Sequence, residues 1–269
     1  PGSIRIVVIN LKRSTRRRAA CQSKLAEHGL QAEYFEACDA ASPDQSWFEQ
    51  QDPEAFLVNT GRHATAGELA CFASHKALWQ RCVRERTPIL IMEDDFKLSQ
   101  AFPAAVSSAA QLVDEYGFIR LQSETRARSR TIRSMGDFQL RLYSKVPHSM
   151  MCYALSPNAA AGLLAHCDTF SAPVDVFVKQ FWLHRQAIYG LKPYTVTESS
   201  LSSESRIGHR EKAPRGPVPR VLRQLTRYIG ALKGAMYSRR LRRQVNVEQS
   251  VKRDSQATDG AIAGQTVSR

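Results

Sequence analysis

The stretch Pro88-Ile-Leu-Ile-Met-Glu-Asp-Asp-Phe-Lys-Leu98 joins a short apolar run to three consecutive carboxylates. Residues 89–92 are all apolar, and such a run beside a turn signal is typical of a strand that is buried on both faces of a sheet. In an extended chain, Glu93 and Asp95 point to one side and Asp94 to the other. Three adjacent negative charges at the end of a buried strand repel one another unless a positive group neutralises them.

A hard divalent cation is the neutralising group that this pattern favours, because such ions prefer oxygen ligands and often bind phosphates at the same time. In open α/β sheets, ligands bind beyond the carboxyl ends of the strands. A cation site at residues 93–95 is therefore one interpretation. The other is a solvated acidic turn without a function, since acidic residues commonly follow strands.

Length and composition are those of an ordinary globular protein. The 269 residues allow one large domain or two small ones, and 43% of them are hydrophobic. We exclude residues 1–3 (Pro-Gly-Ser) from fold reasoning as a cleavage scar, and we expect neither a signal peptide nor a membrane-spanning segment. Six cysteines without a Cys-x-x-Cys pair indicate reduced thiols and a cytosolic location.

The order of elements predicts an α/β fold. Residues 4–11 form an expected central strand, a helix follows to about His28, and residues 34–38 form a second strand. Such a strand–helix–strand unit implies parallel pairing with a right-handed crossover. Further along we expect, in order, a loop with short helical pieces (42–63), helices at 67–84 and 101–116, a third parallel strand (118–121), a hairpin or flap (120–141), a strand (149–155), a helix (156–166) and a last strand (189–196).

No glycine-rich nucleotide motif, nucleophile elbow or typical His/Cys metal spacing occurs. Nucleotide binding would therefore depend on carboxylates and a metal. The segment 12–18 holds five basic residues, which form either a solvated helix face or, for one or two of them, contacts to a diphosphate.

Three stretches resemble glycosyltransferase family 25, the bacterial lipooligosaccharide galactosyl- and glucosyltransferases. They are Val8-Ile9-Asn10-Leu11-x-Arg13-Ser14-x-x-Arg17-Arg18, Thr65-x-Gly67-Glu68-x-x-Cys71-x-x-Ser74-His75-x-x-Leu78-Trp79, and Ile91-Met92-Glu93-Asp94-Asp95. Weaker similarity follows at 153–160 and 173–175. The resemblance covers about residues 4–208, whereas residues 120–147 and everything after 208 match no known pattern.

The resemblance implies a single GT-A type, Rossmann-like α/β catalytic domain over residues 4–208, with a mixed and mainly parallel sheet. It also implies an inverting transfer of a hexose, galactose or glucose, from a UDP-sugar to a lipooligosaccharide or lipopolysaccharide acceptor. The expected cofactor is a divalent metal ion, Mn²⁺ or Mg²⁺, that acts as a Lewis acid for the departing nucleotide.

In this family-like context we expect Asp95 and Glu93 to bind the metal ion, with Asp94 as a supporting contact. Asn10 and Arg13, at the end of the first strand, are candidates for contacts to the nucleotide.

Two further motif residues and one carboxylate complete the predicted site. Ser74 is a candidate donor contact and His75 a candidate catalytic residue, although a histidine in the middle of a helix is more often structural. Inversion requires a general base, and we expect Asp175 in this role because its apolar sequence context would raise its pKa. The alternative for Asp175 is an N-cap of the following helix.

The C-terminal part of the chain is strongly basic. Residues 209–243 contain eleven of the Lys and Arg residues and one acid, whereas the whole chain has a net charge of +13. We predict a basic amphipathic helix over 209–243 and a disordered tail over 244–269. Its apolar stripe consists of Val218, Val221, Leu222, Leu225, Tyr228, Ile229, Leu232 and Met236.

This helix predicts a peripheral contact with an anionic membrane, at the cytoplasmic face of the bacterial inner membrane. The alternative is a helix that packs its apolar stripe on the catalytic domain. Two other classes of protein compete with the glycosyltransferase. A nucleic-acid-binding protein would explain the basic charge, but the basic residues are not interleaved with aromatics. A metal-dependent nucleotide-sugar hydrolase would share the same site.

Overall fold

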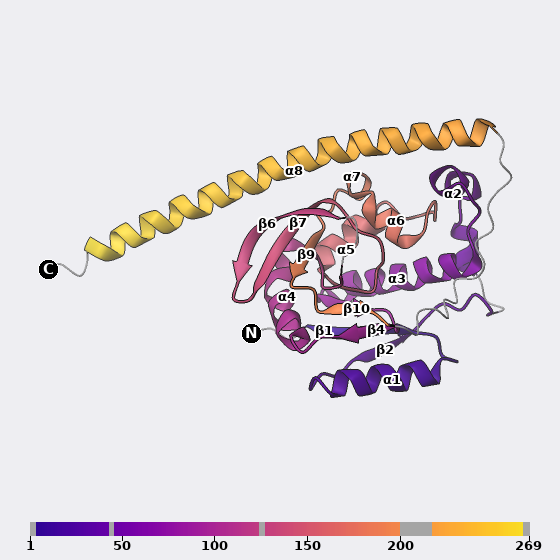
Figure 1. Ribbon diagram of the computed structural model, residues 1–269, viewed down its shortest axis with the longest axis horizontal. Coiled ribbons are helices and arrows are strands. Elements are labelled where there is room, and N and C mark those ends of the chain that lie inside the picture. Colours follow the sequence, from indigo (N-terminus) through magenta and orange to yellow (C-terminus); the bar gives the residue numbers. More distant parts are fainter. Residues whose placement is uncertain (1–3, 43–45, 124–126, 200–216, 266–269) are drawn as a thin grey trace.

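A computed structural model describes residues 4–42, 46–123, 127–199 and 217–265 (Figure 1). Its centre is an eight-stranded mixed sheet with the strand order β2-β1-β3-β8-β5-β9-β7-β6. In that order the strands are Glu33–Glu36, Arg5–Asn10, Ile89–Met92, Cys152–Leu155, Phe118–Arg120, Tyr189–Lys192, Phe138–Lys145 and Arg128–Met135. The architecture confirms the predicted mixed α/β sheet of the GT-A type.

Three parallel strands form one end of this sheet, because β1 pairs in parallel with both β2 and β3. The predicted strand–helix–strand unit is present, with α1 (Thr15–Ala26) between β1 and β2. Strand β8 is antiparallel to both β3 and β5, so β5 runs in the same direction as β3 without touching it. The predicted third parallel strand, β5, therefore runs in the expected direction. The strand that separates it from β3, β8, is antiparallel.

Helices cover both faces of the sheet. Apolar residues of α3 (Ala66–Glu85), α5 (Pro157–Leu164) and α6 (Val174–Lys179) pack on one face, together with α7 (Phe181–His184). Residues of α1 and α4 (Phe102–Tyr116) pack on the other face. Strand β3 is completely buried between these two layers, as its unbroken apolar sequence predicts.

Local signals explain where several helices begin. Thr65 and Glu68 form a complete capping box at the start of α3. The expected loop over 42–63 contains two short helices, η1 (Ser46–Gln50) and α2 (Pro53–Thr60). The excursion after residue 120 is a hairpin of β6 and β7. A small antiparallel sheet joins β4 (Phe96–Leu98) to β10 (Val196–Glu198), directly after the carboxylate turn.

The basic segment near the C-terminus is helix α8 (Pro217–Gln265), which passes over α2, α7 and the hairpin and extends beyond the rest of the chain (Figure 1). Helix continues past residue 243, where we expected a disordered tail to begin. Residues 209–216 of the predicted amphipathic segment lie outside the described residues. The division into a catalytic domain and an extension stays a prediction.

Helix α8 packs on the domain through Gly230, Gly234, Tyr237, Leu241 and Val245, and not through the described residues of its apolar stripe. A Cβ atom at Gly234 would lie 3.0 Å from the Trp182 ring, and one at Gly230 would lie 3.2 Å from it. Tyr237 Oη donates a hydrogen bond to the Arg185 carbonyl oxygen. The stripe residues Val221, Leu225, Tyr228, Ile229, Leu232 and Met236 are all exposed. The side chains of Val218 and Leu222 lie outside the described residues.

Candidate active site

A cavity of about 540 Å³ lies at the carboxyl ends of the three parallel strands. Segments that follow β1, β2 and β3 form one part of its wall, and the first turns of α3 and α6 form another. Six of the eight site residues predicted from the sequence line this cavity, namely Arg13, Ser74, Glu93, Asp94, Asp95 and Asp175. The fold thus brings together residues that are up to 162 positions apart.

Asp94 is neutralised by protein groups. Its Oδ1 atom accepts a hydrogen bond from Arg17 Nη1 at 2.8 Å, and its Oδ2 atom accepts one from Asn10 Nδ2 at 2.7 Å. Both carboxylate oxygens therefore have partners from the end of β1 and the first turn of α1. Asp94 links the β1 and β3 ends of the cavity, and it leaves the binding of a cation to its neighbours.

Asp95 is the least compensated carboxylate of the turn. Its Oδ1 atom is buried and has no hydrogen-bond partner among the described residues. Burial, followed by the charges of Glu93 and Asp94, raises the pKa of Asp95 to about 6. A buried acceptor oxygen among like charges fits a hard divalent cation, and Glu93 on the same turn offers further oxygens.

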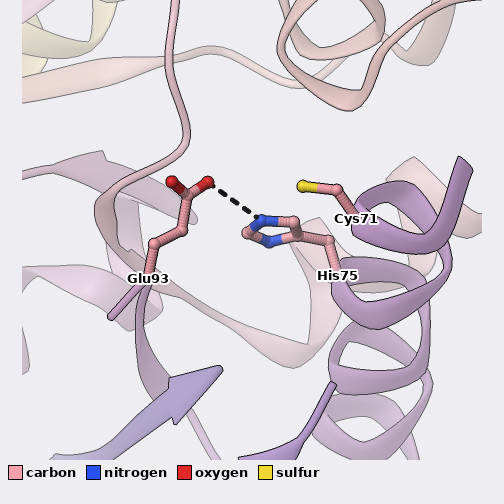
Figure 2. Close-up of side chains that lie close together, drawn as sticks. All are labelled: Cys71, His75 and Glu93. Atoms are coloured by element: carbon pink, nitrogen blue, oxygen red, sulfur yellow. Dashed lines mark ion pairs between the residues drawn. The ribbon is translucent and has the colours of Figure 1, made fainter. Parts of the chain in front are cut away.

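Asn10 and His75 are buried and do not line the cavity. Asn10 acts through Asp94, as described above. The His75 ring is fully buried, with Nδ1 2.8 Å from Tyr153 Oη, which also accepts a hydrogen bond from Trp79 Nε1. Nε2 points toward Glu93 Oε1 at 3.4 Å, and the Cys71 thiol lies beside it (Figure 2).

Ser74 and Arg13 hold the segment after β2 at the cavity wall. Ser74 lies within α3, and its Oγ atom accepts a hydrogen bond of 2.9 Å from the backbone N–H of Cys38. Arg13 forms an ion pair with Asp39, and both side chains line the cavity. The guanidinium of Arg13 therefore lies at the cavity wall, where a cationic group can bind an anionic ligand.

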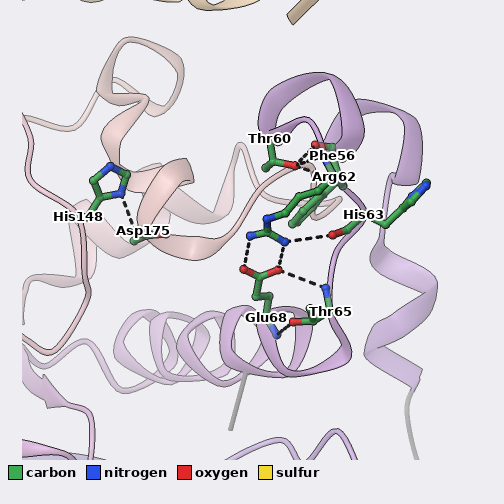
Figure 3. Close-up of polar contacts among 8 residues, drawn as sticks. All are labelled: Phe56, Thr60, Arg62, His63, Thr65, Glu68, His148 and Asp175. Carbon is green, nitrogen blue, oxygen red and sulfur yellow. Dashed lines mark hydrogen bonds and ion pairs between the residues drawn. The ribbon is translucent and has the colours of Figure 1, made fainter. Parts of the chain in front are cut away.

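Asp175 lies in the first turn of α6, and the N-cap of this helix is Pro173. The alternative role of Asp175 as a side-chain cap is therefore wrong. Its Oδ2 atom accepts hydrogen bonds from His148 Nδ1 at 3.0 Å and from the backbone N–H of Ser149 at 3.4 Å (Figure 3). Lys179 Nζ lies 2.6 Å from the other ring nitrogen of His148.

These contacts correct the expected pKa of Asp175. Burial by itself raises the pKa of this carboxyl, but the hydrogen bonds from His148 and from backbone N–H groups outweigh burial and lower the pKa below its usual value. The expectation of a raised pKa rested on the apolar residues next to Asp175 in the sequence. His148 is 27 positions away and reaches Asp175 through the fold.

A buried ion pair fixes the start of α3 beside the cavity. Glu68 accepts hydrogen bonds from Arg62, of which the one from Nη1 to Oε2 is 2.6 Å long, and also from the backbone N–H of Thr65 (Figure 3). The Arg62 guanidinium lies over the Phe56 ring. Because Glu68 is 3% exposed and fully paired, it orders the helix that carries Cys71 and Ser74.

Sequence reasoning missed several polar cavity residues as site candidates, among them Arg17, Cys71, His148 and Glu198. Arg17 and Cys71 are part of the motifs quoted above, so the motifs could have indicated them. His148 and Glu198 stand in no recognisable pattern, and only the positions of β8 and β10 bring them to the cavity. Ser149 beside His148 has a positive φ of 73°, which is uncommon for a residue other than glycine.

Comparison with known proteins identifies the class. The sequence profile described as glycosyltransferase family 25 (LPS biosynthesis protein) matches residues 3–178. This match covers more than half of the chain, and the chain therefore belongs to glycosyltransferase family 25 and is a glycosyltransferase.

Several curated proteins are similar to parts of this chain. A glycosyltransferase 25 family member of Drosophila pseudoobscura pseudoobscura is 30% identical over 64% of this chain and 29% of its own length. The lipooligosaccharide biosynthesis protein lic2B of Haemophilus influenzae is 35% identical over 35% of this chain and 34% of its own length. Procollagen galactosyltransferase 2 of Mus musculus is 29% identical over 42% of this chain and 19% of its own length. The matched segments thus span about a third or less of these relatives.

Within the described part of the chain, none of the helices combines the length and the apolar character needed to cross a membrane. All six cysteines are free thiols, as the sequence analysis predicts.

Proposed function

We propose that this glycosyltransferase moves a hexose, galactose or glucose, from a UDP-sugar to a lipooligosaccharide or lipopolysaccharide acceptor with inversion at the sugar carbon. The relative named as a lipooligosaccharide biosynthesis protein and the relatives named as galactosyltransferases support this choice of substrates. The cavity supports it as well, because it combines carboxylates with the cationic side chains of Arg13 and Arg17.

The observation that carries the proposal is the unpartnered, buried Oδ1 atom of Asp95 beside Glu93, at the carboxyl end of β3; no partner for it occurs among the described residues. Asp95 and Glu93 would hold Mn²⁺ or Mg²⁺, which supplies Lewis-acid stabilisation of the departing diphosphate when it is bound. Asn10 and Arg17 hold Asp94 in place, so the turn presents its other two carboxylates to the cavity. Arg13 would contact the nucleotide diphosphate.

Asp175 is the proposed general base. It lines the cavity, and its lowered pKa keeps it ionised and able to accept the proton of an acceptor hydroxyl. His148 and the Ser149 backbone N–H hold one of its oxygens. In this role Asp175 takes the proton from the hydroxyl oxygen as that oxygen attacks the sugar. His75 would act indirectly, by its position beside Glu93.

A thermal-shift screen of nucleotide sugars, with and without Mn²⁺, tests the donor and the metal together. A ligand that binds only the folded state raises the melting temperature, by an amount that grows with its concentration relative to the dissociation constant. We expect UDP-hexoses with Mn²⁺ to give the largest increase. The proposal fails if no UDP-sugar shifts the melting temperature. Release of free sugar at the same rate with and without acceptor would indicate a hydrolase instead.

We also propose that α8 places the enzyme on an anionic membrane surface, where a lipid-linked acceptor would be located. The exposed apolar stripe of α8 is accompanied by exposed cationic side chains, among them Arg227, Lys233 and Arg239. The six stripe residues whose side chains the structure describes are exposed and do not pack on the domain, which was the alternative considered above. Apolar side chains bordered by Lys and Arg match the chemistry of an anionic lipid surface.

Sedimentation with anionic liposomes tests this contact in the full-length protein. The variant Leu225→Glu removes apolar area from the stripe and adds one negative charge. The matched control, Gln224→Glu, adds the same charge at an exposed polar position next to it. We expect a larger loss of binding for Leu225→Glu than for the control. Equal binding of both variants, or no binding of the unmodified protein at low salt, would contradict the membrane proposal.

A further inference from the structure

Cys71, His75 and Glu93 form a side-chain cluster at the edge of the cavity, and the proposed transfer reaction assigns a direct role only to Glu93. Cys71 and His75 are one helical turn apart on the same side of α3, and Glu93 approaches from the turn after β3 (Figure 2). One ligand atom from each residue lies within 4.8 Å of the other two. The three side chains therefore converge from two elements on one point.

The distances suit a tetrahedral ion. Zinc binds nitrogen and oxygen at about 2.0–2.2 Å and sulfur at about 2.3 Å, so neighbouring ligand atoms are separated by about 3.4–3.6 Å. His75 Nε2 and Glu93 Oε1 are already 3.4 Å apart. The remaining separations, all within 4.8 Å, need to close by at most about 1.4 Å to reach the separations expected from those bond lengths.

The state of His75 points independently to a ligand. Its side chain is completely buried, and Nε2 has no hydrogen-bond partner among the described residues. The 3.4 Å separation from Glu93 is longer than an ordinary N–H···O hydrogen bond. The other ring nitrogen, Nδ1, is held by Tyr153 Oη, whose ring stacks on Phe118 with centroids 4.6 Å apart. This contact fixes the orientation of the ring, and Nε2 is free to bind a metal in the tautomer whose Nδ1–H donates to Tyr153 Oη, as the second ring nitrogen of metal-binding histidines does.

We infer that Cys71, His75 and Glu93 form a binding site for a zinc-class transition-metal ion, with the fourth position open to the cavity. Thiolate and imidazole ligands select zinc-like ions, whereas the carboxylate oxygens at Asp95 select Mg²⁺ or Mn²⁺. Three protein ligands with one open position match the coordination of accessible zinc sites. This inference goes beyond the proposed function, because Cys71 and His75 are not ligands of the proposed Mn²⁺ or Mg²⁺ site, with which Glu93 is shared.

Cobalt substitution tests the site in the full-length, chelator-treated and reduced protein. Co²⁺ is the probe, because a thiolate ligand gives a charge-transfer absorption and four-coordinate Co²⁺ gives intense visible bands. We expect one equivalent of Co²⁺ to produce both signals and a stoichiometric amount of Zn²⁺ to remove them. No charge-transfer band in the unmodified protein would overturn the inference without any variant being needed.

Matched variants assign the ligands. Cys71→Ser should abolish the charge-transfer band, whereas Cys38→Ser, which changes another cysteine of the same cavity, should leave it unchanged. Glu93→Gln, at a partly exposed turn, should weaken Co²⁺ binding about tenfold or more while the band persists at saturation. A band that survives in Cys71→Ser, or that is lost in Cys38→Ser, would overturn the assignment. Thermal unfolding of each variant confirms that it is folded.

Discussion

Two carboxylates in the same cavity, Asp95 and Asp175, have opposite pKa changes although burial acts on both in the same direction. Asp95 has Glu93 and Asp94 as neighbours, and its pKa is raised to about 6. Asp175 has His148 and backbone N–H groups as neighbours, and its pKa is lowered. Burial alone therefore does not decide the charge of a carboxylate, because the partners that the fold supplies can reverse its effect.

The different partners of Asp95 and Asp175 have a consequence for the chemistry of each carboxylate. The protein supplies hydrogen-bond donors to Asp175, so this side chain is ionised without any ligand. It supplies none to Asp95 Oδ1 among the described residues, so the negative charge there is balanced only when a cation binds. Asp175 is therefore prepared to accept a proton, and Asp95 is prepared to bind a metal ion.

Replacing Asp95 should have the largest effect. We expect Asp95→Asn to lower transfer by more than about 100-fold, since even outer partners of metal ligands cost about 10- to 100-fold. In chelator-treated protein the same change should raise stability by about 1 kcal/mol, because the fold disfavours the ionised form of Asp95. Activity assays and urea unfolding measure the two effects. Asp114→Asn, at an exposed position on α4, is the control and should change neither. Full activity of a folded Asp95→Asn enzyme would refute the metal site.

Asp175→Asn should reduce the chemical step by about two to three orders of magnitude, within the usual range for the loss of a general base. The affinity for the UDP-sugar should remain within about twofold, because the proposed donor contacts are made by other residues, namely Arg13 and the metal-binding Glu93 and Asp95. Single-turnover kinetics and donor titrations separate the two quantities. A collapse of donor affinity would make Asp175 a binding residue.

Removing His148 should bring Asp175 closer to the behaviour of Asp95. In His148→Ala, burial is no longer opposed by the His148 hydrogen bond, so the pKa of Asp175 should rise. With a raised pKa, Asp175 becomes protonated as the pH falls, and the activity at pH 6 relative to pH 8 should therefore be lower than in the unmodified enzyme, by up to about tenfold. The pH dependence of kcat/KM measures this change. A uniform loss at every pH would contradict the proposal that His148 acts by lowering the pKa of Asp175.

The smallest effect on activity is expected at Asp94, the carboxylate that the protein already neutralises. Arg17→Gln removes one of its partners from a mostly buried pair and should destabilise the fold by about 2 kcal/mol, with a loss of activity of only a few-fold. Urea unfolding measures the stability. Arg16→Gln, at the exposed neighbouring position, should stay within about 0.5 kcal/mol of the unmodified protein. Equal stability of both variants would mean that Asp94 is not compensated by Arg17.

Much of the fold followed from short-range patterns in the chain. The apolar run before Glu93, the strand–helix–strand unit at the start and the capping box at Thr65 each depend on residues a few positions apart. Such patterns are readable because strand alternation, helix periodicity and capping are local properties of the backbone. They were sufficient to place six predicted residues around one cavity, although the role of each stays a prediction.

The tertiary structure decided what depends on distant partners. The pKa of Asp175 is set by His148, the cluster at Cys71 and His75 needs Glu93 from another element, and neither pairing leaves a trace in local sequence. Helix α8 is the clearest case, because its apolar periodicity shows that a stripe exists but not which way it faces. Close contact of Gly230 and Gly234 with the Trp182 ring turns the stripe outward, since only a side without side chains approaches the ring so closely. The exposed face of α8 is therefore determined by shape complementarity between segments far apart in the chain, which no local pattern encodes.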